Sequence, residues 1–153
     1  MNREIKFRAW HKEKKVMIDN IQDTYDGLLF GPKDEDGYGT VSIYDVDLRL
    51  SSSFGNFLEN DDVEVMQYTG IQDKKGQQIY EKDIVNVDFG KDDDDNYTGQ
   101  VSFDYGKFWV VKHNGYGGEG YDFDFLCNKD LHSHTAKLEV VDNVFMNPEL
   151  INN

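Results

Sequence analysis

Ligands suited to a soft metal ion gather in one short stretch of this chain, residues 127–134. His132 and His134 are two positions apart, so both imidazoles would lie on one face of a strand, and Cys127, the single cysteine, could supply a third ligand. The spacing matches no structural zinc pattern, and the residues between Cys127 and His132 have the composition of a turn. We expect no metal site here. A metal-dependent hydrolase built on the two histidines is the weakest functional alternative.

Three other stretches resemble ligand-binding motifs but lack a part that the chemistry needs. The run Asp92-Asp93-Asp94-Asp95 could collect Mg²⁺ or Ca²⁺ loosely, but four like charges repel one another and stay solvated. The acidic stretch 34–37 lacks the first and last ligands of a calcium-binding loop. Residues 115–120 match G-x-G-x-x-G, yet a dinucleotide site needs a helix next, and residues 121–125 alternate like a strand. We therefore expect no catalytic residue, no cofactor and no metal, and a protein that is not an enzyme.

Aromatic residues are the more informative set. Residues 97–125 contain more aromatic side chains than one wall of a small barrel can bury, so some of them should lie on the surface. Exposed aromatic rings beside acidic groups could form a groove for a peptide, a cage for a cation or a subunit interface. Our candidates for such an interaction surface are Tyr97, Trp109, Tyr116 and Tyr121.

The charge distribution excludes one class of partner. The chain holds 30 acidic and 16 basic residues, a net charge of −14. Residues 1–20 contain six basic and three acidic residues, so the acidic excess lies in the remainder of the chain. Such a surface repels phosphates, which makes direct binding to nucleic acid unfavourable. It could instead meet a basic protein, or serve only to keep the protein soluble.

The expected location follows from hydropathy and cysteine content. No apolar run approaches the roughly 20 residues that span a bilayer, and residues 1–6 alternate in charge, unlike a signal peptide. One cysteine cannot form an internal disulfide, which fits a reducing compartment. We expect a cytoplasmic protein with no membrane partner.

Most of the secondary structure that the sequence predicts is strand. Apolar and polar residues alternate over 4–19, where a polar break indicates a hairpin, and residues 51–62 form a linker with room for one helical turn. Tyr105-Gly106-Lys107 is the tightest hairpin signal. Asn147-Pro148-Glu149 has the composition of a helix start, with asparagine as the cap. The remaining expected strands are 28–30, 40–44, 63–69, 77–80, 84–89, 99–105, 108–113, 121–126 and 138–144. Short strands at this spacing indicate a mainly β protein with minor α content, built around a small barrel.

Two reversals lie close together in the stretch 67–90. Asp73-Lys74-Lys75-Gly76 suits a type I turn followed by a left-handed glycine. Glu81-Lys82-Asp83 is a second reversal, which leads into the apolar segment 84–87. We interpret this arrangement as turn chemistry rather than reaction chemistry.

The same stretch carries a family resemblance. The string YTGIQDKKGQQIYEKDIVNVD resembles a core motif of the YopX family of phage and prophage proteins. The opening IKFRAWHKEKKVM and the closing LEVVDNVFMNPELI are similar to the ends of that family, so the resemblance spans the chain. It departs at His11, where an acid is usual, and at Lys82 and Asp142, where the family has glycines.

The resemblance implies an SH3-like barrel over residues 63–153, preceded by a smaller β-rich unit over 1–62, and a protein that self-associates in a bacterial host cytoplasm. It implies no reaction, because the family is functionally uncharacterised. Our leading hypothesis is a non-enzymatic phage accessory module that binds itself and a host or phage protein. The alternative is an acidic decoy that mimics nucleic acid and blocks a DNA-binding host protein.

Overall fold

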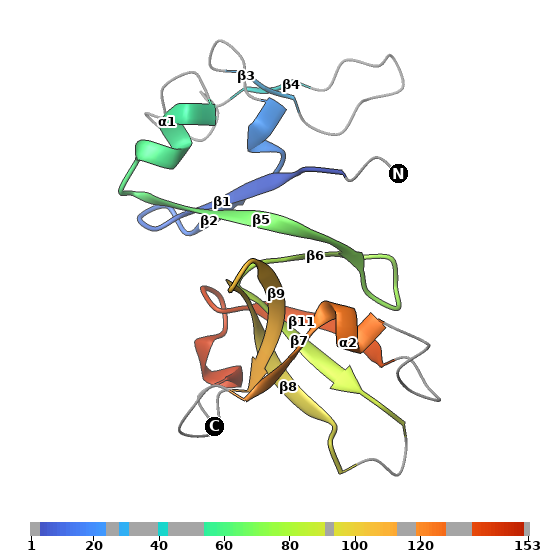
Figure 1. Ribbon diagram of the computed structural model, residues 1–153. Helices are drawn as coiled ribbons and strands as arrows, with labels where there is room; N and C mark the ends of the chain where they lie inside the picture. Colours follow the sequence, from blue (N-terminus) through green and yellow to red (C-terminus); the bar gives the residue numbers. More distant parts are fainter. Residues whose placement is uncertain are drawn as a thin grey trace. The chain divides into compact units, whose positions relative to one another are not determined.

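The computed structural model describes residues 4–23, 28–30, 40–42, 54–90, 94–112, 119–127 and 136–151. The chain divides into two compact units, Met1–Gln67 and Tyr68–Asn153, and both consist mainly of strands (Figure 1). The prediction of a mainly β protein is confirmed. The boundary between the units falls after Gln67, within strand β5 (Val63–Gln72), whereas the sequence placed it at the start of that strand.

The N-terminal unit is built on an antiparallel hairpin. Strand β1 (Phe7–His11) pairs with β2 (Val16–Ile18) on one side and with the first half of β5 on the other. The hairpin expected over residues 4–19 is therefore confirmed. The unit also contains η1 (Ile21–Asp23), the pair β3 (Leu28–Phe30) and β4 (Thr40–Ser42), and α1 (Phe54–Glu59). Its core is formed by Ala9, Ile18, Ile21, Phe57 and Val63.

The C-terminal unit is a five-stranded antiparallel sheet that curls into a half-barrel. Strands β7 to β10 follow one another as a meander, and the last strand, β11, returns to pair with β7. The second half of β5 pairs with β6 (Gln78–Tyr80) and leads into this sheet. The sheet strands are β7 (Asp83–Asp88), β8 (Tyr97–Asp104), β9 (Lys107–Lys112), β10 (Gly120–Asp122) and β11 (Lys137–Asn143).

Two glycines, one on each strand that pairs with β9, lie against the same stretch of its backbone. A Cβ atom on Gly99 of β8 would lie 2.6 Å from the carbonyl oxygen of Val111. A Cβ atom on Gly120 of β10 would collide with the carbonyl oxygen of Val110. Glycine in a strand often marks such a close approach of two backbones. The close approach of both neighbouring strands to β9 thus depends on the missing side chains at both positions.

The β8–β9 hairpin has a two-residue turn. Asp104 pairs with Lys107, which leaves Tyr105 and Gly106 as the turn residues, with φ of 49° and 75°. Two positive φ angles define the type I′ turn that matches the twist of a hairpin. The predicted tight hairpin is confirmed, with the unusual feature that its first turn residue is a tyrosine.

The strand expected over residues 121–126 is wrong beyond its first two residues. Strand β10 ends at Asp122, and a short helix follows, α2 (Phe123–Cys127). The Oδ1 atom of Asp122 accepts a hydrogen bond from the backbone N–H of Phe125 at 2.7 Å, as a helix-capping side chain does. Phe123 and Leu126, three residues apart, are the buried positions. The aromatic residues at 121, 123 and 125 alternate with acidic residues as in a strand, and this alternation does not reveal that Asp122 caps a helix.

The C-terminal turn corrects a second detail. A 3₁₀ helix, η3 (Pro148–Leu150), forms at the predicted place, but the side chain of Asn147 does not cap it. The side-chain amide of Asn147 instead donates a hydrogen bond to the carboxylate of Asp142. The register of β11 shifts between Val140 and Asp142, which marks a bulge. Asp142, which stands where the family has a glycine, therefore lies beside this bulge.

Candidate functional site

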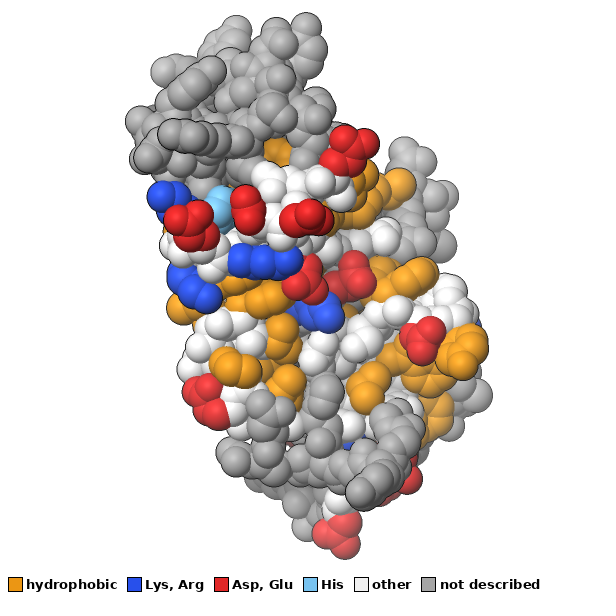
Figure 2. Space-filling model, turned by 90° about the vertical axis from the view of Figure 1, so that its left-hand side faces the viewer, with side chains coloured by type: hydrophobic (Ala, Val, Ile, Leu, Met, Phe, Trp, Pro, Cys, Tyr) orange, Lys and Arg blue, Asp and Glu red, His pale blue; other side chains and the backbone are white. Residues whose placement is uncertain are grey.

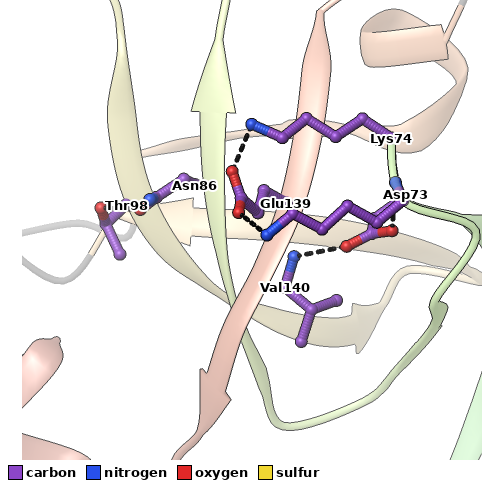
Figure 3. Close-up of polar contacts among 7 residues, drawn as sticks. Asp73, Lys74, Asn86, Thr98, Glu139 and Val140 are labelled. Carbon is purple, nitrogen blue, oxygen red and sulfur yellow. Dashed lines mark hydrogen bonds and ion pairs between the residues drawn. The ribbon is translucent and has the colours of Figure 1, made fainter.

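The motif in residues 69–83 is the first candidate, and its centre is the buried carboxylate of Asp73. The Oδ1 atom of Asp73 accepts hydrogen bonds from the backbone N–H groups of Lys75, at 2.8 Å, and Gln77, at 2.9 Å. Its Oδ2 atom accepts one from the N–H of Val140 on β11, at 3.0 Å. Figure 3 shows this carboxylate reaching from its turn to the neighbouring strand. Both carboxylate oxygens of Asp73 therefore accept hydrogen bonds from backbone N–H groups.

Hydrogen bonding decides the ionisation of Asp73. Burial by itself would raise the pKa of this carboxyl, but the N–H groups of Val140, Gln77 and Lys75 outweigh burial and hold the pKa below its usual value. The backbone N–H of Lys74 also donates to the carbonyl of Leu138 at 2.9 Å. The 73–77 turn is thus bonded along one edge of β11.

The lysines of the turn lie over the same strand. The ammonium groups of Lys74 and Lys75 each pair with one oxygen of the Glu139 carboxylate, which lies between them (Figure 3). The lysine side chains are substantially exposed to water, so these ion pairs add little to stability. They do, however, engage the carboxylate of Glu139 on β11.

The other polar members of the motif are also engaged by backbone. The Oδ2 atom of Asp83 accepts from the N–H of Tyr80 at 2.8 Å. The hydroxyl of Thr69 donates to the carbonyl of Ile79 at 2.8 Å and accepts from the N–H of Ile71 at 3.1 Å. Buried polar groups in proteins are normally satisfied in this way. These contacts support the interpretation of the motif as turn chemistry.

The metal candidates from the sequence fall mostly outside the described residues. His132, His134, Asp92 and Asp93 lie outside them. Within the part of the chain that the structure describes, no three His, Cys, Asp or Glu side chains are grouped so that they could hold a metal ion. Cys127 is half-buried, and burial, with a smaller contribution from Asp124, raises the pKa of its thiol.

The four candidate aromatic residues divide into different environments. Tyr97 belongs to the core: it is 9% exposed, and its hydroxyl donates to the carbonyl of Val110 at 2.8 Å. It therefore presents no exposed ring, because position 97 faces the enclosed side of the sheet. Tyr121 is half-buried and stacks on Phe125 with ring centroids 4.6 Å apart. Trp109 is half-buried, and its indole N–H donates to the carbonyl of Asp104 at 3.0 Å. Tyr116 lies outside the described residues.

Among the residues whose side chains the structure describes, the two most exposed aromatic rings are not among our four candidates. Tyr105 is 92% exposed and Phe103 is 50% exposed, both at the end of the β8–β9 hairpin. We refer to residues 103–109 as the hairpin tip. The hairpin signal at 105–107 marked the right place, because a two-residue turn projects its first side chain into water. On the face drawn in Figure 2, hydrophobic side chains reach the surface of the molecule beside acidic and basic ones.

Charged groups surround the hairpin tip. The ammonium of Lys107 lies 3.1 Å from an oxygen of Asp124 and 3.4 Å from one of Asp122. Hydrogen bonds to Asp124, and then to Asp122, raise the pKa of Lys107. Asp104 is exposed on the same hairpin. The ammonium of Lys107 is thus paired with two carboxylates, those of Asp122 and Asp124.

These features define a mainly β protein with an SH3-like half-barrel, in which the polar side chains of the 69–83 motif hydrogen-bond to backbone groups. A family model described as YopX protein matches residues 6–152, and the chain belongs to that family. The predicted family membership is confirmed.

Two solved structures resemble the whole chain. Protein EF1440 from Enterococcus faecalis has a TM-score of 0.54 and 22% sequence identity, covering 98% of this chain and 99% of its own. Protein yopX from Bacillus subtilis has a TM-score of 0.49 and 21% identity, covering 95% and 96%. The likeness to EF1440 shows a shared fold. No curated protein matches the chain. Among the described residues, no helix is both long enough and apolar enough to cross a membrane.

Proposed function

We propose that this chain is a non-enzymatic protein-interaction module that works in a bacterial host cytoplasm and binds a host or phage protein through its hairpin tip. The observation that carries the proposal is Tyr105, which combines a φ of 49° with an exposed fraction of 92%. A residue with a side chain costs about 1–2 kcal/mol in the left-handed region. Backbone strain of this kind concentrates at functional positions.

The fold itself gains little from the ring of Tyr105. Asparagine or glycine would suit the first position of a type I′ turn better, and a ring in water contributes no burial. Phe103 is half exposed beside it, and its ring lies 4.9 Å from that of the buried Phe108, which supports it from behind. Exposed aromatic residues on a rigid support are typical of protein interfaces.

The use of the buried acids supports a non-catalytic role. Asp73 and Asp83 are the buried carboxylates among the described residues, and both accept hydrogen bonds from backbone N–H groups of their own turns. A general acid or base needs a carboxyl that can reach a substrate. These two are committed to the fold.

Self-association has a separate candidate surface. Val141, Met146 and Leu150 are exposed hydrophobic side chains on β11 and the segment after it. We call these three the C-terminal patch. Apolar side chains gathered on one segment favour an interface between identical copies, because the same patch serves both partners.

Sedimentation equilibrium over micromolar concentrations tests the self-association. The average mass should rise with concentration in the unaltered protein, and the double variant Met146→Ser with Leu150→Ser should remain a monomer. Tyr105→Asn is the matched control, because it removes an exposed ring elsewhere and should leave the association unchanged. A strict monomer in the unaltered protein would remove self-association from the proposal.

The role of the hairpin tip is tested through stability and binding together. Tyr105→Asn creates an Asn-Gly turn and should raise the free energy of unfolding by about 0.5–1 kcal/mol. The same variant should lose the partner that the unaltered protein retains. A variant that is more stable and binds less cannot be explained by misfolding. Unchanged binding would reject the hairpin tip as the binding surface.

A further inference from the structure

We infer that His11 makes the β1–β2 turn sensitive to mild acid: the turn is held while the imidazole is neutral, and it loosens when the imidazole takes up a proton. This inference concerns the N-terminal unit by itself and does not depend on the proposed function. It is carried by the hydrogen bond that the Nδ1 atom of His11 accepts from the backbone N–H of Lys14, at 3.1 Å, and by the burial of His11, which is 6% exposed.

The contact with Lys14 defines which nitrogen of the ring carries the hydrogen. A backbone N–H only donates, so Nδ1 must offer its lone pair, and in a neutral imidazole the hydrogen is then on Nε2. A proton added to this ring binds at Nδ1 and takes up that lone pair. The acceptor becomes a donor that faces the N–H of Lys14. Protonation of His11 and this hydrogen bond therefore exclude each other.

The turn depends on His11 at two points. The backbone N–H of Lys15 donates to the carbonyl oxygen of His11 at 2.9 Å, and the N–H of Lys14 donates to its ring. Lys15 has a φ of 57°, a left-handed conformation that is unfavourable for a residue with a side chain. The hydrogen bonds to His11 offset this strain, so the loss of the one made by the ring should loosen the turn.

The surroundings of the ring are unfavourable for a charge. His11 pairs with Val16 of β2 on one side and with Val63 of β5 on the other. Residues directly opposite each other in an antiparallel pair have their side chains on the same face, so two valines flank the imidazole. Ala9, two residues earlier on that face, belongs to the core of the N-terminal unit. A charge placed there loses much of its hydration.

Charged side chains near the turn do not remove this cost. Those on the described elements beside His11 are Lys12, Glu13, Lys14 and Lys15 of the turn, Asp61 and Asp62 before β5, and Glu64 on β5. Glu64 lies opposite Trp10, on the other face of the sheet. The other six are exposed, so water and salt screen their interaction with the ring. The hydrogen bond and the burial therefore decide the effect of protonation.

Hydrogen exchange of the Lys14 amide tests the inference in the full chain. Its protection is measured by NMR from about pH 8 to about pH 5, the range in which histidine changes charge, and is corrected for the pH dependence of exchange in an unstructured peptide. The chain has four histidines, so His11→Asn is the matched control. The Oδ1 atom of asparagine is attached to Cγ as Nδ1 is in histidine, so it can accept the same N–H, and it does not titrate.

We expect the protection of the Lys14 amide in the unaltered protein to fall about tenfold as the pH is lowered across this range, the effect of losing one buried hydrogen bond. In His11→Asn the protection should stay constant. His11→Leu has no acceptor at this position and should show the low protection throughout. A further measurement needs no variant: at about pH 8, the nitrogen chemical shifts of the imidazole should show Nδ1 without a hydrogen and Nε2 with one.

Three results would overturn the inference. Constant protection in the unaltered protein would mean that the turn does not respond to protonation of the ring. An equal fall in His11→Asn would assign the acid sensitivity to another group. A hydrogen on Nδ1 at about pH 8 would show that the ring does not accept from the N–H of Lys14.

Discussion

The carboxylate of Asp73 accepts a hydrogen bond from the backbone N–H of Val140, which is 3.0 Å away in space and 67 residues further along the chain. The same side chain holds the N–H groups of Lys75 and Gln77. One residue thus shapes a local turn and bonds it to the last strand of the sheet. Because an uncovered strand edge invites pairing with other chains, this turn also protects part of β11.

Asp73→Ala should be strongly destabilising. It leaves three backbone N–H groups without the carboxylate that they share, and we expect a loss of about 3 kcal/mol in the free energy of unfolding. Urea denaturation followed by Trp109 fluorescence in the Trp10→Phe background measures it. Lys75→Ala is the matched control: it removes only an exposed ion pair with Glu139 and should cost less than about 0.5 kcal/mol. Similar losses in the two variants would contradict the structural role of Asp73.

The contribution of Asp73 should depend on pH in a defined direction. Its folded pKa lies below the ordinary value of 3.8, because the N–H groups of Val140, Gln77 and Lys75 outweigh burial. The unfolded chain then binds the proton more readily, so the stabilisation is complete above pH 3.8 and is lost as pH falls through the lower folded pKa. Acid titrations of stability for the unaltered protein and Asp73→Ala should converge in that range. Curves that stay parallel down to complete acid unfolding would count against this account.

Lys82→Gly should stabilise the protein. Lys82 has a φ of 65° in the reversal between β6 and β7, at a position where the family resemblance has glycine. Relief of the left-handed strain exceeds the extra chain entropy of glycine, so we expect a gain of about 0.5–1 kcal/mol. Thermal and urea unfolding measure it. Glu13→Gly, at an exposed turn position without positive φ, should instead lower stability. If both substitutions changed stability in the same direction, relief of left-handed strain at position 82 would be excluded as the explanation.

Gly99→Ala should disrupt the curled sheet. The new methyl group would lie 2.6 Å from the carbonyl oxygen of Val111 and 2.9 Å from Cγ1 of Val110, so the backbone of β8 or β9 must move. We expect a loss of about 2–3 kcal/mol in the free energy of unfolding. Gly76→Ala places the same methyl in open space and should cost only about 1 kcal/mol for its left-handed backbone. Equal costs would show that the close approach at Gly99 is not what sets the curvature.

Tyr97→Phe should change the response to alkali. Burial is the main reason that the pKa of Tyr97 is raised from 10.0 to about 12. The folded state therefore holds the proton more tightly, and this contribution to stability is complete below pH 10.0 and is lost between pH 10.0 and about 12. The variant should lose about 1 kcal/mol at neutral pH with the hydrogen bond to Val110. Its difference from the unaltered protein should narrow in alkali, as urea denaturation across that range would show. Tyr105→Phe, at an exposed ring, should show no such narrowing.

The local part of the fold was predictable from residue order. Alternation and turn residues located the β1–β2 hairpin and the reversal at Tyr105-Gly106. The turn at residues 73–76 also forms as expected: the N–H of Gly76 donates to the carbonyl of Asp73 at 3.0 Å, and the φ of Gly76 is 82°. Each of these signals acts over a few residues, and the forces that set them act over the same distance.

The helix α2 shows where local patterns are ambiguous. Phe123 and Phe125 alternate with acids, which is typical of a strand, but Phe123 and Leu126 also have the spacing of a helical face. The helix is favoured over the strand by the carboxylate of Asp122, which caps it, and by the burial of Leu126 in the core of the half-barrel. Neither contact can be inferred from the alternation of aromatic and acidic residues along the chain.

Residue order alone was enough to predict a mainly β chain of the YopX family with a net charge of −14, because composition, periodicity and motif are properties of residue order. Which aromatic rings face water depends on the folded arrangement of the strands. Tyr97 and Tyr105 lie on the same strand-and-turn segment, yet one is buried and the other is exposed. Tyr97 packs in the core of the half-barrel and donates to the carbonyl of Val110, whereas Tyr105 lies in the two-residue turn, where no neighbouring strand covers it.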